Sequence, residues 1–239
     1  MRIGCVKYLN ARPLIHGWPA PIEFDHPAAL CRKLASGELD VALVSSFEFL
    51  RNPTYTIVDK VAIAADGPVY SVVIAHQGKL ETIALDPASE TSVNLLRCIR
   101  DARVVTPDER YDAQLLIGDQ AIRFRAAHAH EYSFLDLAEE WKRITELPFV
   151  FALWLVRPGV PNARETAEQL RALRDANLRA LDDVIAAQTE FPPEFCAGYY
   201  RENLRFEFGA REKQGLLHFH SLCVKHGILR PADVALRLI

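Results

Sequence analysis

The chain has 239 residues, of which half are hydrophobic and a quarter are charged, and its formal net charge is −3. This composition is typical of a soluble globular protein whose length allows one large domain or two lobes of roughly 100 to 130 residues. Two function classes are excluded: the Lys and Arg residues are too scattered for nucleic-acid binding, and no stretch reaches the ~20 apolar residues of a membrane span.

The first predicted element is a short buried strand over residues 3–6, and Tyr-Leu-Asn-Ala-Arg-Pro-Leu follows it at residues 8–14. A strand that ends in Tyr, Asn and Arg brings an aromatic ring and hydrogen-bonding groups to its carboxyl end. Open α/β sheets bind their ligands at that end. Because the strand begins almost at Met1, we expect no secretion signal before it, and a cytoplasmic protein.

Strand-like runs alternate with helical runs through the middle of the chain. The pairs are residues 41–44 with 47–50, 82–85 with 93–100, and 115–117 with 121–124. Two longer apolar strands, at 69–75 and 149–156, enclose a segment of about 75 residues with its own alternation. This pattern predicts central mixed or parallel sheets flanked by helices.

We therefore predict an α/β fold of two lobes with a ligand cleft between them. The first lobe is expected to comprise residues 1–78 with 158–239, and the second lobe residues 79–157. The chain then crosses twice between the lobes, which is typical of a hinge. The part after Pro158 is expected to be helical and to pack on the first lobe.

Four predicted strands end in small polar residues at the start of a helix. Unpaired amides and the positive end of the helix dipole favour anions such as carboxylates there. Capping alone explains any single junction, because Ser, Thr and Asp are common N-caps. Four junctions in two facing lobes favour a shared anionic ligand. The residues are Asn10 with Arg12, Ser45 with Ser46, Ser89 with Thr91 and Ser92, and Gly118 with Asp119.

Two further segments are candidates for the cleft. The turn at Gly67-Pro68, which leads to Ser71, allows the backbone to approach a ligand closely, or is only a loop turn. Phe151 and Trp154 on the returning strand are expected to share a face and to form an aromatic wall of the cleft, unless both belong to the core.

Motifs for other chemistries are weak or missing. His218 and His220 would point about 200° apart on a helix, which argues against a metal site, although His220 and Cys223 at i, i+3 spacing stay an alternative. The sequence has no GxSxG, no P-loop and no GxGxxG. The five cysteines form no CxxC pair, so we expect them to be reduced. No metal and no cofactor are predicted.

Six segments of the chain resemble, in order, the chorismate dehydratase family of menaquinone biosynthesis. They are YLNARPL at 8–14, DVALVSS at 40–46, GPVYSV at 67–72, SETSV at 89–93, LIGD at 116–119 and LPFVFALW at 147–154. Together these segments spread over most of the chain.

The resemblance implies a two-lobed fold like that of type II periplasmic binding proteins and a cytoplasmic enzyme without a cofactor. The implied reaction converts chorismate into 3-[(1-carboxyvinyl)oxy]benzoate on the futalosine route. The expected partners are this dicarboxylate substrate and, as an open point, a second copy of the chain. Two alternatives remain: the sister 1,4-dihydroxy-6-naphthoate synthase, and a binding or sensory protein that turns nothing over.

The resemblance also suggests roles for particular residues. Asn10 is expected to be catalytic through hydrogen bonds near the departing hydroxyl or near the proton acceptor, because an amide is no base near neutral pH; a turn role is the alternative. The substrate's own enolpyruvyl carboxylate is then a candidate base. Glu90 stands where the family is expected to have a basic residue, so the contacts to a substrate carboxylate are expected from its neighbours. The predicted substrate-binding residues are Tyr8, Arg12, Ser45, Ser46, Gly67, Pro68, Ser71, Ser89, Thr91, Ser92, Gly118, Asp119, Phe151 and Trp154.

Overall fold

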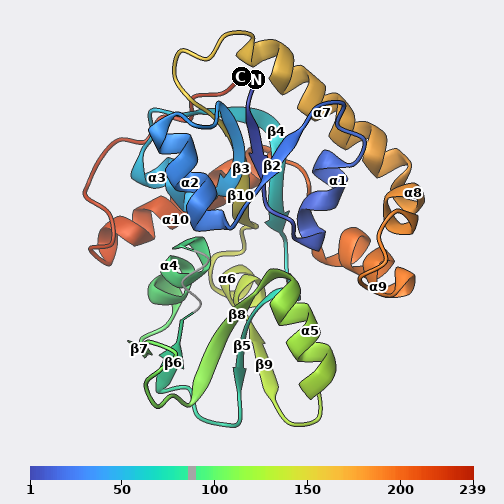
Figure 1. Ribbon diagram of the computed structural model, residues 1–239. Helices are drawn as coiled ribbons and strands as arrows, with labels where there is room; N and C mark the ends of the chain where they lie inside the picture. The colour runs from blue at the N-terminus through green and yellow to red at the C-terminus, as the bar shows by residue number, and fades with distance from the viewer. Residues whose placement is uncertain (86–89) are drawn as a thin grey trace.

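The computed structural model describes residues 1–85 and 90–239, and it contains two β-sheets, one in each lobe (Figure 1). The first sheet has the order β2 (Ile22–Phe24), β1 (Ile3–Cys5), β3 (Val41–Ser45), β10 (Phe149–Val156) and β4 (Thr56–Ala65). The second has the order β7 (Arg103–Val105), β6 (Thr82–Ala84), β8 (Ala113–Ile117), β5 (Val72–His76) and β9 (Ser133–Asp136).

Both sheets are mixed, as the sequence predicted. In the first sheet β1 runs parallel to β2 and β3, while β10 runs antiparallel to β3 and β4. In the second sheet β6 runs parallel to β7 and β8, while β5 runs antiparallel to β8 and β9. Strand β3 is buried along its whole length, which explains its continuous apolar sequence.

Helices cover both sheets. Those of the first lobe are the 3₁₀-helix η1 (Leu9–Ala11), α1 (Arg12–Ile15), α2 (Pro27–Ser36), α3 (Ser46–Arg51), α7 (Ala163–Arg179), α8 (Leu181–Ala186), α9 (Pro193–Gly198), the π-helix η2 (Tyr199–Asn203) and α10 (Ala210–Lys225). Those of the second lobe are α4 (Glu90–Ile99), α5 (Gly118–His128) and α6 (Leu137–Thr145). In the described part of the chain no helix has the length and apolar character that a membrane crossing needs.

The predicted lobe boundaries at residues 78 and 157 do not coincide with the two places where the chain passes from one sheet to the other. Strand β5 was expected in the first lobe, but it pairs with β8 and β9 of the second sheet. Strand β10 was expected in the second lobe, but it lies between β3 and β4 of the first sheet. A run of apolar residues predicts a buried strand and does not say which sheet the strand joins, so the crossings lie one strand earlier in the chain than predicted.

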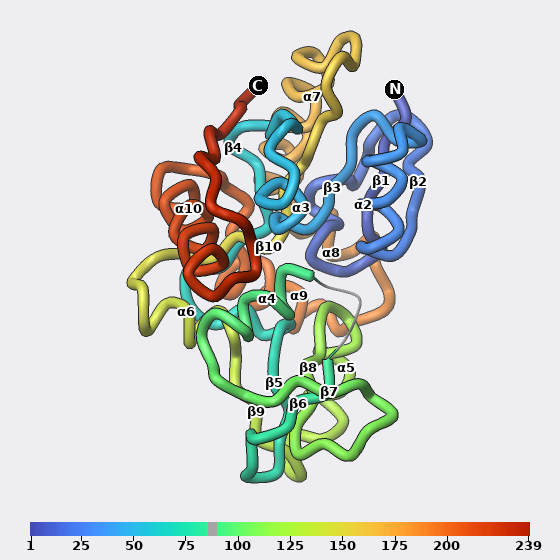
Figure 2. Tube along the Cα trace, turned by 90° about the vertical axis from the view of Figure 1, so that its left-hand side faces the viewer, coloured from blue at the N-terminus to red at the C-terminus, as the bar shows by residue number. Residues whose placement is uncertain are grey.

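Helix α10 links the two lobes through close packing (Figure 2). It contacts β10 of the first sheet and also α4 of the second lobe. At Gly215 this helix lies directly against the return crossing, because a Cβ atom there would stand 2.1 Å from the carbonyl oxygen of Pro148. The glycine is therefore required by the close approach of two backbones and not by an unusual φ.

We predict that Gly215→Ala lowers the free energy of unfolding by about 1–3 kcal/mol, because the added methyl group must push α10 away from Pro148. Gly198→Ala is the matched control, since a Cβ atom at Gly198 has no neighbour within 4 Å. Alanine should raise stability there by about 0.5–1 kcal/mol through helix propensity. Urea denaturation measures both, and equal effects would contradict the packing argument.

Candidate functional site

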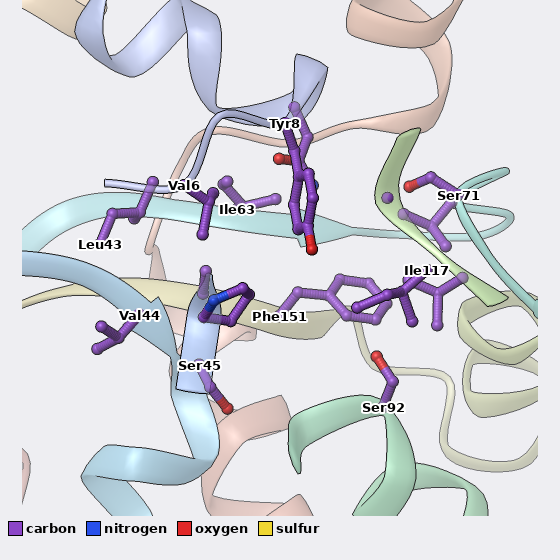
Figure 3. A pocket seen from close by; sticks show the side chains of 16 residues that line it. Val6, Tyr8, Leu43, Val44, Ser45, Ile63, Ser71, Ser92, Ile117 and Phe151 are labelled. Atoms are coloured by element: carbon purple, nitrogen blue, oxygen red, sulfur yellow. The ribbon is translucent and has the colours of Figure 1, made fainter. Parts of the chain in front are cut away.

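A cavity lies between the two lobes, and both sheets contribute to its lining (Figure 3). Its empty space is about 620 Å³, including the part that is open to solvent. The lining residues are Val6, Tyr8, Asn10, Pro27, Leu43, Val44, Ser45, Ile63, Val69, Ser71, Val72, Ser92, Ile117, Gly118, Phe151 and Ala152. Ligand cavities of enzymes have this composition, with apolar walls and a few placed polar groups.

Seven of the predicted site residues come together in this lining. They are Tyr8, Asn10, Ser45, Ser71, Ser92, Gly118 and Phe151. Figure 3 shows the Tyr8 ring extending into the space above the Phe151 ring, with Ser45 and Ser92 below. The polar groups therefore stand at the edges of a space whose walls are apolar, an arrangement that suits a flat ring with polar substituents.

Asn10 lies on η1, immediately after the first strand, and its Oδ1 atom is buried without a hydrogen-bond partner among the described residues. An unsatisfied buried acceptor costs about 1–3 kcal/mol. A ligand that donates a hydrogen bond in the cavity would remove this cost. The position of Asn10 in the lining therefore supports a contact with a hydroxyl or amine of a ligand.

The backbone next to Asn10 is held from two sides. The Leu9 amide donates a 2.8 Å hydrogen bond to Asp119 Oδ1 of the second lobe. The Tyr200 hydroxyl donates a 2.9 Å hydrogen bond to the Leu9 carbonyl. Asp119 thus acts on the backbone and is not part of the cavity lining, and burial raises the pKa of its carboxyl group. These contacts fix the segment that carries the candidate catalytic residue.

Gly118 allows the Tyr8 ring to cross the cleft. A Cβ atom on Gly118 would lie 3.1 Å from the Tyr8 ring, and its φ of +56° falls in the left-handed region that favours glycine. The ring therefore rests against the start of α5 in the opposite lobe. The LIGD segment thus provides a surface for the aromatic side chain as well as a helix start.

Thr91 meets the start of α3 across the cleft. Its hydroxyl forms a short hydrogen bond with the Ser45 hydroxyl and accepts one of 3.3 Å from the Phe47 amide. Ser46 is fully buried and donates to the Val150 carbonyl at 2.7 Å. The two helix starts that the sequence predicted separately therefore face each other. Thr91 and Ser46 themselves are engaged by protein groups and do not line the cavity.

The remaining predicted residues lie away from the cavity. Arg12 pairs at 2.5 Å with Glu190, which also pairs with Arg123 of the second lobe at 2.9 Å. Gly67 and Pro68 lie on the first crossing, where the Pro68 carbonyl accepts from Asn203. Ser89 lies outside the described residues.

Trp154 was expected to share a face with Phe151, and this expectation was wrong. Side chains three residues apart on a strand point to opposite faces, because the period is two. Phe151 lines the cavity, whereas Trp154 is fully buried in the core. The aromatic wall consists of Phe151 and Tyr8 instead.

Sequence reasoning missed several residues that shape the site. The Tyr199 hydroxyl donates a 2.7 Å hydrogen bond to Ser71 Oγ in the cavity wall, and Tyr200 holds Leu9. The sequence predicted both tyrosines only as packing residues, since no motif surrounds them. The apolar wall residues Val6, Leu43, Val44, Val69, Val72 and Ile117 were predicted as strand positions without a role in binding. Ile63 lies on β4, a strand that the sequence analysis did not predict.

The histidine-rich segment on α10 faces other groups. His218 packs edge-on against Trp141, with ring centroids 5.6 Å apart. Cys223, the residue that could have joined His220 as a ligand, lies against Cys98. In the described ranges no three His, Cys, Asp or Glu side chains are grouped to hold a metal ion.

The fold defines the class: two α/β lobes, joined by two crossings and with a cavity between them, have the fold of periplasmic binding proteins. A crystal structure of a protein from Archaeoglobus fulgidus has a TM-score of 0.72 at 18% identity, with 95% of this chain and 98% of that one covered. The periplasmic aliphatic sulphonate binding protein of Escherichia coli has a TM-score of 0.64 at 15% identity, with 99% and 95% covered. The predicted periplasmic-binding-protein-like fold is confirmed.

A family model described as menaquinone biosynthesis matches residues 1–225. A chorismate dehydratase from Thermus thermophilus is 32% identical over 91% of this chain and 93% of that protein. Another, from Campylobacter jejuni, is 32% identical over 61% of this chain and 58% of that protein. The chain belongs to this menaquinone-biosynthesis family, as the six segments predicted.

We predict that Gly118→Ala lowers the free energy of unfolding by about 1 kcal/mol for the left-handed backbone and by roughly 1 kcal/mol more for the overlap with the Tyr8 ring. Gly17→Ala is the control, because Gly17 has a φ of +76° and a Cβ atom there meets nothing within 4 Å. Denaturant titration compares the two variants. An equal loss of stability would show that the Tyr8 ring yields without cost.

A pH dependence follows from Asp119. The pKa of Asp119 is raised in the folded protein, so the folded protein holds this proton more tightly than the unfolded chain does. The stability that Asp119 contributes is therefore largest below the ordinary pKa of 3.8. This contribution declines as the pH rises through the pKa of the folded protein. Asp119→Asn keeps an acceptor for the Leu9 amide and removes the ionisation. Relative to the parent protein, its free energy of unfolding should therefore increase between about pH 3 and pH 7.

Asp112→Asn is the control of opposite sign. Hydrogen bonds from Thr82 lower the pKa of Asp112, so its contribution is lost as the pH falls through the folded pKa. The relative stability of this variant should decrease over the same pH range. Denaturation curves of the three proteins at several pH values give both slopes, and parallel curves would refute the assignment.

Proposed function

We propose that this protein is a chorismate dehydratase, which removes water from chorismate to give 3-[(1-carboxyvinyl)oxy]benzoate. The observation that carries the proposal is the unpartnered Asn10 Oδ1 in an apolar cavity of a chain that belongs to the menaquinone-biosynthesis family. The two relatives named chorismate dehydratase support it.

The shape of the cavity fits the chemistry of this elimination. Chorismate loses its ring hydroxyl and a neighbouring ring proton, so its ring becomes aromatic and flat. Tyr8 and Phe151 provide aromatic surfaces, and the other walls are aliphatic. Such walls bind the ring while the hydroxyl groups at the edges orient its substituents. A flat product would fit the space between the two side chains.

Asn10 would act by hydrogen bonding. Its Oδ1 accepts the hydrogen of the ring hydroxyl and so fixes the bond that breaks, whereas its amide cannot take a proton near neutral pH. The ring proton is acidified through the ring double bond by the ring carboxylate. The enolpyruvyl carboxylate of the substrate itself would accept that proton in an intramolecular step. The carboxylic acid so formed would pass the proton to the departing hydroxide, which leaves as water.

The carboxylates of chorismate would be bound by neutral donors. The described residues that line the cavity include no Lys, Arg or His, and Arg12 is engaged by Glu190. Glu90 forms an ion pair of 2.8 Å with Arg51. The positive charge of Arg51 therefore offsets part of the repulsion between Glu90 and a substrate carboxylate. The donors in the described lining are the serine hydroxyls, the Tyr8 hydroxyl, the Asn10 side-chain NH2 and backbone amides, and fixed donors of this kind also stabilise charge that spreads during reaction.

We further propose that the reaction needs no cofactor, and that the protein acts on the futalosine route in the cytoplasm. The resemblance supports these points, and the expectation of a cytoplasmic protein also rests on the early first strand and the unpaired cysteines; a homodimer stays an open point. A protein that only binds an anion is the second candidate, because the fold is shared with solute-binding proteins. The sister synthase would act on a cyclic futalosine derivative instead.

The test is incubation of the purified protein with chorismate and no added cofactor. We expect an aromatic enol ether, seen by ultraviolet absorbance and mass spectrometry. Tight binding in calorimetry without product would overturn the enzyme in favour of a binding protein. Turnover of the cyclic futalosine derivative alone would identify the sister synthase.

Asn10→Ala tests the catalytic residue. We expect kcat to fall by about 10²–10³-fold with a much smaller change in KM, because the lost hydrogen bond acts mainly on the breaking bond. Asn52→Ala is the control, since Asn52 follows the far end of α3. An equal loss of binding and turnover in the Asn10 variant would leave Asn10 only a positioning role.

A further inference from the structure

Two cysteine thiols from opposite lobes lie in contact. Cys98 stands near the end of α4 in the second lobe, and Cys223 stands on α10 in the first lobe. Their Sγ atoms are 3.7 Å apart, both residues are buried, and both thiols are free. A disulfide has an S–S bond of about 2.05 Å, so a small approach of two packed helices brings these sulfur atoms to bonding distance.

Cys98 and Cys223 lie on helices of different lobes, so the distance between them depends on how far the cleft is open. Helix α4 carries Ser92 of the cavity wall six residues before Cys98, and α10 packs on β10, which carries Phe151. Figure 2 shows α4 and α10 side by side at the junction of the lobes. Any opening that moves α4 away from α10 must therefore separate the two thiols.

The pair borders the surface on the side of Cys98, whereas Cys223 is fully buried. Cys98 is 8% exposed and lines an open surface cavity together with Arg97, Arg100, His226 and Ile228. The two thiols share a hydrogen bond in which either sulfur can donate, and this contact with Cys223 lowers the pKa of Cys98. By contrast, burial raises the pKa of Cys31 to about 12. Since the thiolate is the reactive form, Cys98 is favoured as the attacking sulfur.

We propose that Cys98 and Cys223 form a reversible disulfide that locks the two lobes together. A small-molecule disulfide such as oxidised glutathione is the oxidant. The Cys98 thiolate attacks one of its sulfur atoms, and the first glutathione leaves as thiolate. The Cys223 thiolate then attacks the Cys98 sulfur and releases the second glutathione. Two protein thiols are oxidised, one small disulfide is reduced to two thiols, and the two protons pass to the leaving thiolates.

The consequence is a closed protein that neither admits nor releases its ligand. Formation of the bond links residues that are far apart in the sequence and restricts the unfolded chain strongly. Lobe opening limits ligand exchange in many proteins of two lobes. Reduction would break the bond and restore the exchange.

The test compares the full-length protein after treatment with oxidised glutathione and after treatment with dithiothreitol. Peptide mapping without reduction should show the peptides of Cys98 and Cys223 joined, with the loss of two hydrogen atoms. The midpoint of thermal unfolding should rise by about 5–10 °C. Turnover of chorismate should fall roughly tenfold or more and return after reduction.

Cys98→Ser and Cys223→Ser should abolish the joined peptide and the thermal shift, whereas Cys196→Ser, at another buried cysteine, should retain both. If a variant fails to fold, the mapping of the parent protein still decides the question. Five unmodified thiols, a stable mixed disulfide at Cys98, or a joined peptide without a thermal shift would each overturn the lock. The mapping and the melting curves need no substrate, so they stand apart from the test of the dehydratase activity.

Discussion

The antiparallel pairing of β10 with β3 and β4 is the constraint on which the rest of the structure depends. It forces the chain to leave the first sheet after β4 and to return to it through the middle. The inserted lobe is thereby attached by two adjacent crossings. The same pairing places Phe151 at the cavity, lets the Val150 carbonyl accept from Ser46, and sets Pro148 against α10.

The site that results from this arrangement joins the lobes through hydrogen bonds of hydroxyls, a backbone amide and one buried carboxyl group. Thr91 reaches Ser45, Asp119 reaches the Leu9 amide, and Tyr199 reaches Ser71. Charged pairs such as Arg12 with Glu190 lie outside the cavity lining. Burying an anion away from cations is costly unless hydrogen-bond donors replace the lost water. A site that uses hydroxyls and amides therefore depends on their exact placement, and the interlobe contacts provide that placement.

The alternation of strands and helices predicted the α/β class and a sheet in each lobe, and the polar strand ends predicted Asn10, Ser45, Ser92 and Gly118 of the lining. Periodicity could not show that β5 and β10 exchange lobes, because pairing partners are set by tertiary contacts. It also could not show that Glu190 binds Arg12, since 178 residues separate them. Trp154 was misplaced by an incorrect use of the strand period. Tyr199 and Tyr200 were not recognised because their partners lie far away in the sequence.

The central place of β10 also affects the order in which the chain can fold. The second lobe is continuous, so its sheet is complete once β9 has been made, at Asp136. The first sheet cannot close until β10 follows, and Leu9 gains its contact to Tyr200 only when most of the chain exists. Pairings over such long sequence distances form slowly, because the chain entropy is lost before the contacts stabilise it. During synthesis, the inserted lobe would therefore fold first, and the segment that carries Asn10 would be among the last to reach its final position.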